Sequence, residues 1–256
     1  MEHEPAIRLA AFAAIFALTA AWEWARPRRA ARRGLRWATN LGLVALDSLV
    51  VRLLFPAAAV GAALDAAAEG WGLFNALDAP LWLSVPLSVL LLDFAIWAQH
   101  VAMHLVPALW RLHQVHHADE ALDATTGLRF HPIEIALSMA LKIGLVYLLG
   151  APALGVLIFE VLLNGFAVWT HGNLRLPARV EPLLRRLIVT PEMHRAHHST
   201  IRAEHDTNYG FLLSIWDRAS GFWTERATGE IGLPIERTGR SASLLWSLAL
   251  PFRRLK

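Results

Sequence analysis

Long apolar stretches separated by short polar segments dominate the pattern of this 256-residue chain. Five of them stand out, at residues 6–25, 38–64, 80–106, 134–149 and 152–170. The first three reach the roughly 20 residues that a helix needs to cross a bilayer core about 30 Å thick. The last two are shorter and meet at Gly150-Ala151-Pro152, so they form a helical hairpin that either crosses the membrane or only enters it. The pattern predicts an all-α integral membrane bundle of about four to five membrane segments.

The composition supports a membrane protein rather than a large soluble one. Hydrophobic residues make up 55% of the chain and charged residues only 18%, with a mean hydropathy of +0.40. Soluble domains usually have about 45–50% apolar and about 25% charged residues. The chain has no cysteine, which excludes disulfides, thiolate metal ligands and a cysteine nucleophile. The sequence carries no nucleic-acid-binding motif and no basic stripe with spaced aromatic residues, so we expect no nucleic-acid partner.

The distribution of arginine predicts the orientation of the bundle. Residues 26–36 hold six arginines, Arg32 among them, whereas residues 63–79 hold three acidic residues and no lysine or arginine. By the positive-inside rule, 26–36 faces the cytoplasm and 63–79 faces the other side. The stretch 80–106 then returns to the cytoplasmic side, and the hairpin that follows it also ends there. We expect a bacterial inner membrane as the location.

Histidines carry the chemistry that the sequence predicts. His100 and His104 form an H-x-x-x-H pair, and two H-x-x-H-H triplets follow at 113–117 and 194–198, with His171 alone between them. Residues three and four apart share one face of a helix, so each group can present its side chains together. Imidazole is the commonest metal ligand near neutral pH, and nine such nitrogens are too many for one ion. Combined with the charge pattern, this spacing predicts a dimetal site in a histidine-rich helical cap on the cytoplasmic side.

The ligand type narrows the choice of metal. Imidazole suits zinc, copper, iron and nickel, whereas a structural zinc site takes four ligands and commonly includes cysteine. A large cysteine-free set beside a membrane fits two iron ions with O2 as co-substrate, and zinc as a surrogate in purified protein. We expect His3 to be no ligand, and His205, which lies in a polar stretch, to belong to the surface or to a lid over the substrate.

These histidine groups and their surroundings resemble the fatty acid hydroxylase/sterol desaturase superfamily of membrane diiron enzymes. The family pattern of H-x-x-x-H followed by two H-x-x-H-H groups is complete, and the similarity covers about residues 37–224. Supporting stretches are Trp110–His117, Arg129–Glu134, His171–Asn173, Asn208–Gly210 and Trp216–Arg218. Two departures are Val101, where many members carry arginine, and 220–222, which reads Ser-Gly-Phe where Phe-Gly-Thr is usual. Neither departure falls on an expected ligand.

The resemblance implies a ligand set and residues that support it. With His171 as a ninth ligand, the irons would be held by His100, His104, His113, His116, His117, His194, His197 and His198. His131 is either a further ligand or a residue that orients one. Glu134, Asn173 and Asn208 are candidates to accept N–H groups of the ligands, because a metal-bound imidazole almost always donates its other nitrogen to a partner. Capping or loop hydrogen bonds are the alternative roles for these three, and no catalytic residue beyond the ligands is expected.

The function implied by the resemblance is O2-dependent oxidation, by hydroxylation or desaturation, of a C–H bond in a membrane lipid such as a sterol, a fatty acyl chain or another isoprenoid. An ether-lipid (alkylglycerol-type) monooxygenase or a carotenoid hydroxylase would use the same metal core and remains an alternative. A non-enzymatic metal-binding or transport protein is a third, although transporters place their ligands near the bilayer midplane. Electrons would come from an external donor of the ferredoxin or cytochrome type, docked on the arginine-rich face.

Three regions follow from this interpretation. Residues 1–36 form an N-terminal membrane helix and basic loop, because the first apolar stretch follows acidic residues and lacks a small-residue cleavage site. Residues 37–224 form the catalytic domain. Residues 225–256 form a tail that we expect to be loosely structured before 244–250.

Overall fold

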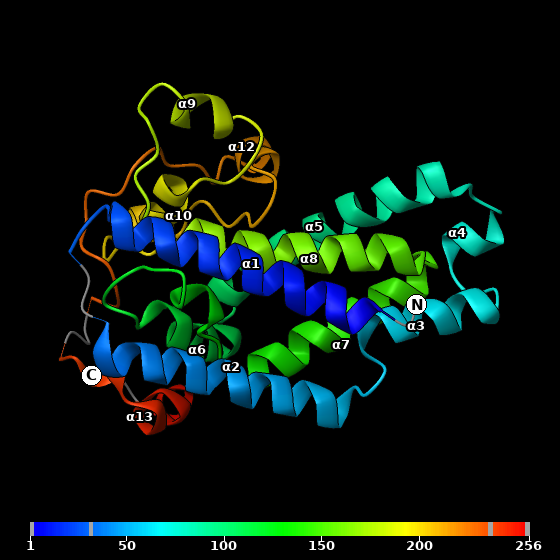
Figure 1. The fold of residues 1–256 in the computed structure, drawn as a ribbon, viewed down its shortest axis with the longest axis horizontal. Coiled ribbons are helices and arrows are strands. Elements are labelled where there is room, and N and C mark those ends of the chain that lie inside the picture. Colours follow the sequence, from blue (N-terminus) through cyan, green and yellow to red (C-terminus); the bar gives the residue numbers. More distant parts are fainter. Residues whose placement is uncertain (1–2, 31–32, 235–237, 254–256) are drawn as a thin grey trace.

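Five long helices form the body of the protein in a computed structural model, which describes residues 3–30, 33–234 and 238–253. They are α1 (Glu4–Ala25), α2 (Gly34–Leu54), α5 (Leu81–Leu105), α7 (Pro132–Leu149) and α8 (Ala153–His171). Figure 1 shows them running along the long axis of the molecule. The described residues form helices, turns and isolated β-bridges, which confirms the predicted all-α class. Arg32 of the basic loop and residues 235–237 and 254–256 of the tail lie outside the described residues.

The five helices differ in how much of their surface the protein covers. In the described part of the chain, each is long and apolar enough to cross a membrane, α2 together with the short helices that follow it. Half of the apolar window of α8 is buried inside the protein, against only 6% of that of α1. α8 packs against α1, α3 and α5, and α7 packs against α2 and α3. α8 is therefore the central helix, whereas α1 leaves most of its apolar surface for lipid.

The stretch 38–64, expected as one apolar segment, is broken in the structure. α2 ends at Leu54 and α3 (Ala58–Ala68) begins after a turn that contains Pro56. Proline lacks the N–H that a helix interior requires and clashes with the preceding turn, so the chain changes direction here. α4 (Leu73–Ala76) then connects α3 to α5.

The last two apolar stretches form α7 and α8, joined by a short turn, but each packs chiefly against other helices, so they do not form the expected hairpin of two helices packed on each other. α7 ends at Gly150, whose φ of 61° is the left-handed conformation that glycine adopts at low cost. A Cβ added to Gly150 would also lie 2.6 Å from the carbonyl oxygen of Trp71, so the connection needs glycine for space as well. Pro152 then precedes the first turn of α8.

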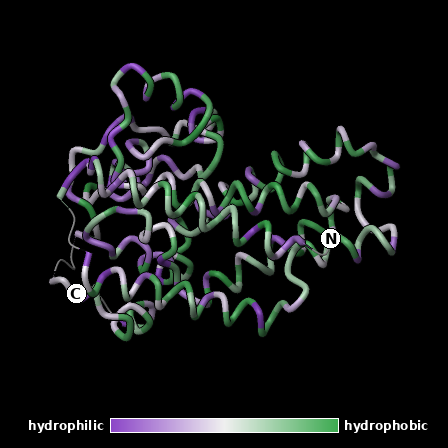
Figure 2. The backbone as a smooth tube through the Cα atoms, in the orientation of Figure 1, coloured by the Kyte–Doolittle hydropathy of each residue, from purple (hydrophilic) through white to green (hydrophobic). Residues whose placement is uncertain are grey.

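The shorter helices and most polar segments gather at one end of the bundle, which we call the cap. Figure 2 shows this end as the more hydrophilic one. The cap contains α6 (Pro107–His117), η1 (Thr126–Leu128), α9 (Glu181–Leu184), α10 (Pro191–His197), α11 (Arg202–His205) and α12 (Ile215–Ser220). The basic loop after α1 lies at the same end, because the amide of Arg28 donates to the carbonyl of Asn173 over 2.8 Å. Arginine-rich and histidine-rich segments thus share one end of the bundle.

The C-terminal segment packs on the cap more closely than the sequence suggested. It contains η2 (Arg240–Ala242), α13 (Leu244–Ala249) and η3 (Leu250–Phe252). Trp246 and Leu250 are buried against the core around Leu43 and Val115. The hydroxyl of Ser247 accepts a hydrogen bond of 2.8 Å from the guanidinium of Arg129. This part of the tail is therefore built into the cap.

Candidate metal centre

Four helices bring the predicted histidines to one place inside the cap. The last two turns of α5 carry His100 and His104, one helical turn apart, and α6 carries its triplet on its last two turns. His171 is the final residue of α8. α10 begins at Thr190, whose side chain accepts from the amide of Met193 as an N-cap, and ends in the second triplet. Because a proline starts both α6 and α10, each short helix has a fixed first turn.

Nine histidines form two buried clusters in the described part of the chain. The first cluster contains His100, His104, His113, His117 and His197, and the second contains His116, His171, His194 and His198. Within each cluster the candidate ligand atoms all lie within 4.8 Å of one another. None of the nine side chains is more than 6% exposed. The clusters touch, since the rings of His117 and His198 stack with their centroids 4.3 Å apart.

Hydrogen bonds in the first cluster leave bare ring nitrogens facing one another. Nδ1 of His100 lies 2.6 Å from the carbonyl oxygen of Tyr209, and Nδ1 of His113 lies 2.7 Å from Oε1 of Glu134. A carbonyl can only accept, so Nδ1 of His100 carries the proton and donates it, and an ionised Glu134 accepts from Nδ1 of His113 in the same way. This leaves Nε2 as a lone-pair acceptor in each neutral ring. The two Nε2 atoms nevertheless lie only 3.0 Å apart. Two lone pairs at this distance repel unless a cation shares them.

The second cluster repeats this arrangement. Nδ1 of His116 donates to the carbonyl of Arg129 over 3.0 Å, and Nδ1 of His171 donates to the carbonyl of Ala167 over 2.6 Å. The Nε2 atoms of His116 and His171 lie 2.9 Å apart, as do those of His171 and His194. Two nitrogens bound at right angles to one ion at about 2.1 Å would be separated by about 3.0 Å. Both clusters therefore fit a metal ion.

Burial keeps the cap histidines uncharged. It lowers the pKa of His113 to about 3. Burial first, and the neighbouring histidines second, lower the pKa of His116, His117, His197 and His198 well below the ordinary value. A neutral imidazole offers its lone pair to a metal, whereas a protonated one cannot. The same burial therefore prepares these side chains as ligands at neutral pH.

Of the three candidate supporting residues, only Glu134 contacts a ligand nitrogen. Asn173 instead accepts from the amide of Arg29 over 3.0 Å and donates to its carbonyl over 2.7 Å, which joins the end of α8 to the basic loop. Asn208 donates to the carbonyls of Met193 and Thr224 over 2.9 and 2.8 Å, and its φ is 56°. These are the loop roles that the sequence left open as alternatives.

Several of the clustered histidines donate hydrogen bonds to backbone carbonyls, and the sequence did not reveal these acceptors. Besides Tyr209, Arg129 and Ala167, the carbonyl of Thr207 accepts from Nδ1 of His197 over 2.8 Å. Asn208 lies between Thr207 and Tyr209, so its side-chain hydrogen bonds fix the loop that supplies two of these carbonyls. A carbonyl belongs to every residue, so side-chain identity gave no signal for this role. The one available signal was the Asn-Tyr-Gly stretch itself.

A buried ionic network supports the loop between α6 and α7. Arg36 forms ion pairs with Asp119, at 2.6 Å, and with Asp123. Arg129 is fully buried and donates to Oδ1 of Asn40 over 2.9 Å and to the carbonyl of Val115 over 2.8 Å. Arg36 is one of the six arginines from which the orientation was predicted, and its side chain is only 6% exposed. The network holds α2 against the segment that carries the first triplet.

His131 and His205, which the sequence left outside the main ligand set, occupy different places. His131 caps α7, where its Nδ1 accepts from the amide of Ile133 over 3.2 Å and its Nε2 lies 3.3 Å from the carbonyl oxygen of Leu248. It belongs to neither cluster. His205 is half-buried and lies over the first cluster, with ring centroids 4.8 Å from His104 and 4.5 Å from His117. Together with His104 and Asp206 it forms a third group of candidate ligand atoms.

Comparisons with known proteins agree with this geometry. Residues 85–222 match the fatty acid hydroxylase family, and this range contains all nine clustered histidines. The ornithine lipid hydroxylase OlsE of Rhizobium tropici is 34% identical over 68% of this chain and 52% of its own length. The alkylglycerol monooxygenase of Homo sapiens is 32% identical over 60% of this chain and 33% of its own length, and that of Xenopus tropicalis is 29% identical over 81% and 44%. No solved structure matches.

The chain spans about half the length of the ornithine lipid hydroxylase and about a third of the human alkylglycerol monooxygenase. One relative is named as a hydroxylase and the other as a monooxygenase. The family match covers more than half of the 256 residues and includes the complete histidine pattern. This chain belongs to the fatty acid hydroxylase family.

Proposed function

We propose that this protein is a membrane-bound diiron oxidoreductase that uses O2 to oxidise a C–H bond of a membrane lipid. The observation that carries the proposal is the pair of adjacent clusters, nine buried neutral imidazoles at one end of a membrane helix bundle. Two iron ions held by these clusters would supply the activation of O2 and the oxidation of an unactivated carbon. The named relatives act on ornithine lipid and alkylglycerol, and a lipid with a long hydrocarbon chain is the substrate class common to them.

The residues of the chain have three tasks in this reaction. Carbonyls and Glu134 hold the rings of five of the nine histidines at Nδ1, which fixes the direction of Nε2 in His100, His113, His116, His171 and His197. The buried network around Arg36 and Arg129 keeps the loop between α6 and α7 rigid. His205 and Trp110 cover the first cluster, with ring centroids 4.9 Å apart, and limit the access of water to it.

Sidedness and electron supply are parts of the same proposal. The basic loop 26–30 and the histidine clusters lie at one end of the bundle (Figure 1), so the positive-inside rule would place both in the cytoplasm. Arg175, Arg179 and Arg202 are exposed in the cap. An acidic ferredoxin- or cytochrome-type donor would dock on such a surface. A bacterial inner membrane is the expected setting.

A transport function is the main alternative of another class. A transporter needs ligands that release the metal along a path, usually near the bilayer midplane. Here the ligands lie at the end of α5 and in cap helices, and hydrogen bonds hold several of their rings in place. This arrangement supports retention of the metal.

The test is the metal content of purified protein, measured for wild type and for one variant in each cluster. We expect about two irons, or surrogate zincs, in wild type, and the loss of one of them in His197→Ala and in His116→Ala, which lie in different clusters. His3→Ala is the matched control, because His3 is exposed and far along the chain from both clusters. Lipids extracted from cells that express the wild-type protein should include species with one added oxygen or with two fewer hydrogens. One metal or none in fresh wild type would refute the diiron proposal.

A further inference from the structure

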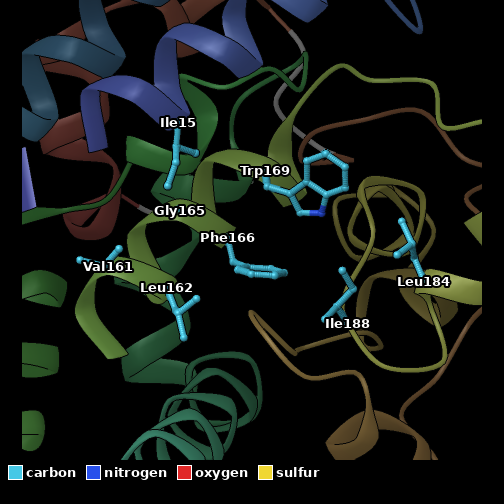
Figure 3. A pocket seen from close by; sticks show the side chains of 8 residues that line it. All are labelled: Ile15, Val161, Leu162, Gly165, Phe166, Trp169, Leu184 and Ile188. Carbon is cyan, nitrogen blue, oxygen red and sulfur yellow. The ribbon is translucent and has the colours of Figure 1, made fainter. Parts of the chain in front are cut away.

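An apolar cavity of about 360 Å³ lies on the flank of the bundle, next to the cap. Its walls come from three segments: Ile15 of α1, Leu162, Phe166 and Trp169 of α8, and Leu184 with Ile188 at and after α9. Figure 3 shows these side chains converging on a common space from separate parts of the chain. The volume falls within the range of about 300–1,000 Å³ that is usual for ligand pockets. The cavity is therefore large enough to hold part of a small molecule.

The walls of the cavity select hydrocarbon and lead to the bilayer. Its lining is entirely apolar, and two of its three walls are candidate membrane helices. Gly165 lies among the lining residues, and a Cβ added there would lie 2.8 Å from Cδ1 of Ile15. Glycine thus allows α1 to approach α8 closely while the space beside it stays open. An occupant that enters from the lipid along α1 would be a hydrocarbon chain.

The segment at the cap end of the cavity has the character of a membrane interface. Leu183 and Leu187 are 61% and 72% exposed, whereas Leu184 and Ile188 line the cavity. Arg179 and Arg186 are exposed on the same segment. Exposed leucines beside arginines are typical of segments that lie at the level of lipid headgroups, and an anionic bilayer surface attracts such arginines. A lipid with its chain in the cavity would place an anionic headgroup beside these arginines.

The cavity also adjoins the elements that hold the second cluster. Trp169 precedes His171 by two residues on α8, and Ile188 precedes the Thr190 cap of α10, which carries His194. Nε1 of Trp169 is buried and has no hydrogen-bond partner among the described residues. The cavity and the second cluster therefore share α8 and the segment that leads into α10.

We propose that this cavity binds one hydrocarbon chain of an anionic membrane lipid, with the headgroup beside Arg179 and Arg186, and so selects the substrate of the enzyme. The selection of a substrate rests on the proposed function, whereas the binding of a hydrocarbon chain in the cavity does not. Chain length and headgroup charge would then determine which lipids the enzyme accepts.

The first experiment maps where a lipid chain lies. Full-length protein in phosphatidylcholine nanodiscs receives phosphatidylglycerol with a diazirine in the middle of one acyl chain, and adducts are located by mass spectrometry after irradiation. We expect adducts on the peptides that contain Ile15, 161–169 and 184–188. Leu162→Trp and Ile188→Trp fill the cavity from opposite walls, and each should lower this labelling at least tenfold. Ile158→Trp, a lipid-facing control on α8 outside the lining, should leave it unchanged.

Labelling spread evenly along α1 and α8, or equal labelling in the filled variants, would overturn the proposal. The headgroup is tested by Arg179→Gln combined with Arg186→Gln, which should lower labelling by the phosphatidylglycerol probe several-fold and leave a phosphatidylcholine probe unaffected. An equal effect on both probes would refute the role of charge.

The outcome separates the cavity from the proposed function. Chain labelling is measured on the protein as purified and needs no turnover, so the proposed oxidation can fail while the lipid site stands. Conversely, if metal-loaded wild type oxidises a lipid and Leu162→Trp neither slows turnover nor lowers labelling, the cavity inference fails and the proposed function stands.

Discussion

The hydrogen bond from His113 to Glu134 allows a graded test of how the cap holds its metals. Oε1 of Glu134 lies 2.7 Å from Nδ1 of His113, and both side chains are buried. In its ionised form Glu134 accepts this N–H through a carboxylate, and such charge-assisted bonds are about twice as strong as neutral ones. Loss of an outer-shell partner of this kind typically costs about 10–100-fold in metal affinity.

Two substitutions of Glu134 should give losses of metal affinity at the lower and the upper end of this range. Glu134→Gln keeps a neutral acceptor for Nδ1–H, so we expect a loss of about tenfold in metal affinity, or about 1.4 kcal/mol. Glu134→Ala leaves the buried N–H without its acceptor, and we expect a loss of about 100-fold in metal affinity, or about 2.7 kcal/mol. The loss should fall on the first cluster alone, because Glu134 contacts His113 and the second cluster has other partners.

The assay is a competition titration of purified protein with zinc and a chelator of known affinity. Asp93→Asn is the matched control, since Asp93 is equally buried but accepts from the amide of Leu213 and the indole of Trp216 and contacts no ligand. Its variant should keep both affinities. Equal affinities in Glu134→Ala and wild type, or an equal loss at both sites, would refute the role given to this hydrogen bond.

Two further predictions concern residues outside the clusters. His131→Ala removes the acceptor for the amide of Ile133 and should cost about 1 kcal/mol of stability, while metal analysis still finds about two ions per chain; loss of one ion would make His131 a ligand. Burial, only partly offset by hydrogen bonds from Trp97, Gly210 and Tyr209, raises the pKa of Asp217 from 3.8 to about 6. The stability linked to this shift is present below pH 3.8 and is lost as the pH rises through 6, so the free energy of unfolding of wild type relative to Asp217→Asn should fall by up to ~3 kcal/mol over that interval. Thermal or denaturant unfolding from acid to neutral pH measures it, and parallel curves for the two proteins would contradict it.

The sequence predicted which histidines come together because their spacing is a local property of helices. His100 and His104, and the members of each triplet, share a helical face whatever the fold around them, and length and composition predicted the apolar helices in the same way. The contacts that bring the histidine groups together join residues that lie far apart in the chain. His100 meets the carbonyl of Tyr209, 109 residues further along the chain. No side-chain pattern reports which carbonyl will face a ring nitrogen.

Buried charge was the other feature that the sequence could not place. Arg36 lies among arginines that count toward the orientation of the bundle, yet its side chain turns inward to Asp119 and Asp123. The break after Leu54 followed from Pro56, a signal that the hydrophobic pattern alone obscured. The burial of Arg36 depends on packing between segments far apart in the chain, whereas the break depends on a single proline, and hydropathy along the chain records neither.

The two clusters differ in the charges around them, which leads to a last prediction. Every side chain in the two clusters is an imidazole, which brings no negative charge, so a bound dication would draw its compensating charge from neighbouring carboxylates. The first cluster has Glu134 on His113, and Asp206 lies 3.5 Å from Nδ1 of His104. In the second cluster the partners of His116 and His171 are backbone carbonyls, which are weaker acceptors than a carboxylate.

The first cluster should therefore hold a dication more tightly than the second, by about tenfold on the scale of one outer-shell carboxylate. Each site can be measured alone, since His116→Ala leaves the first cluster intact and His197→Ala leaves the second. Titration of each variant with zinc against a chelator gives the two affinities, and stepwise chelation of wild type should remove one ion well before the other. If the second cluster binds more tightly, or if the two ions leave together, then the carboxylates beside the first cluster serve the packing of the cap and not the retention of metal.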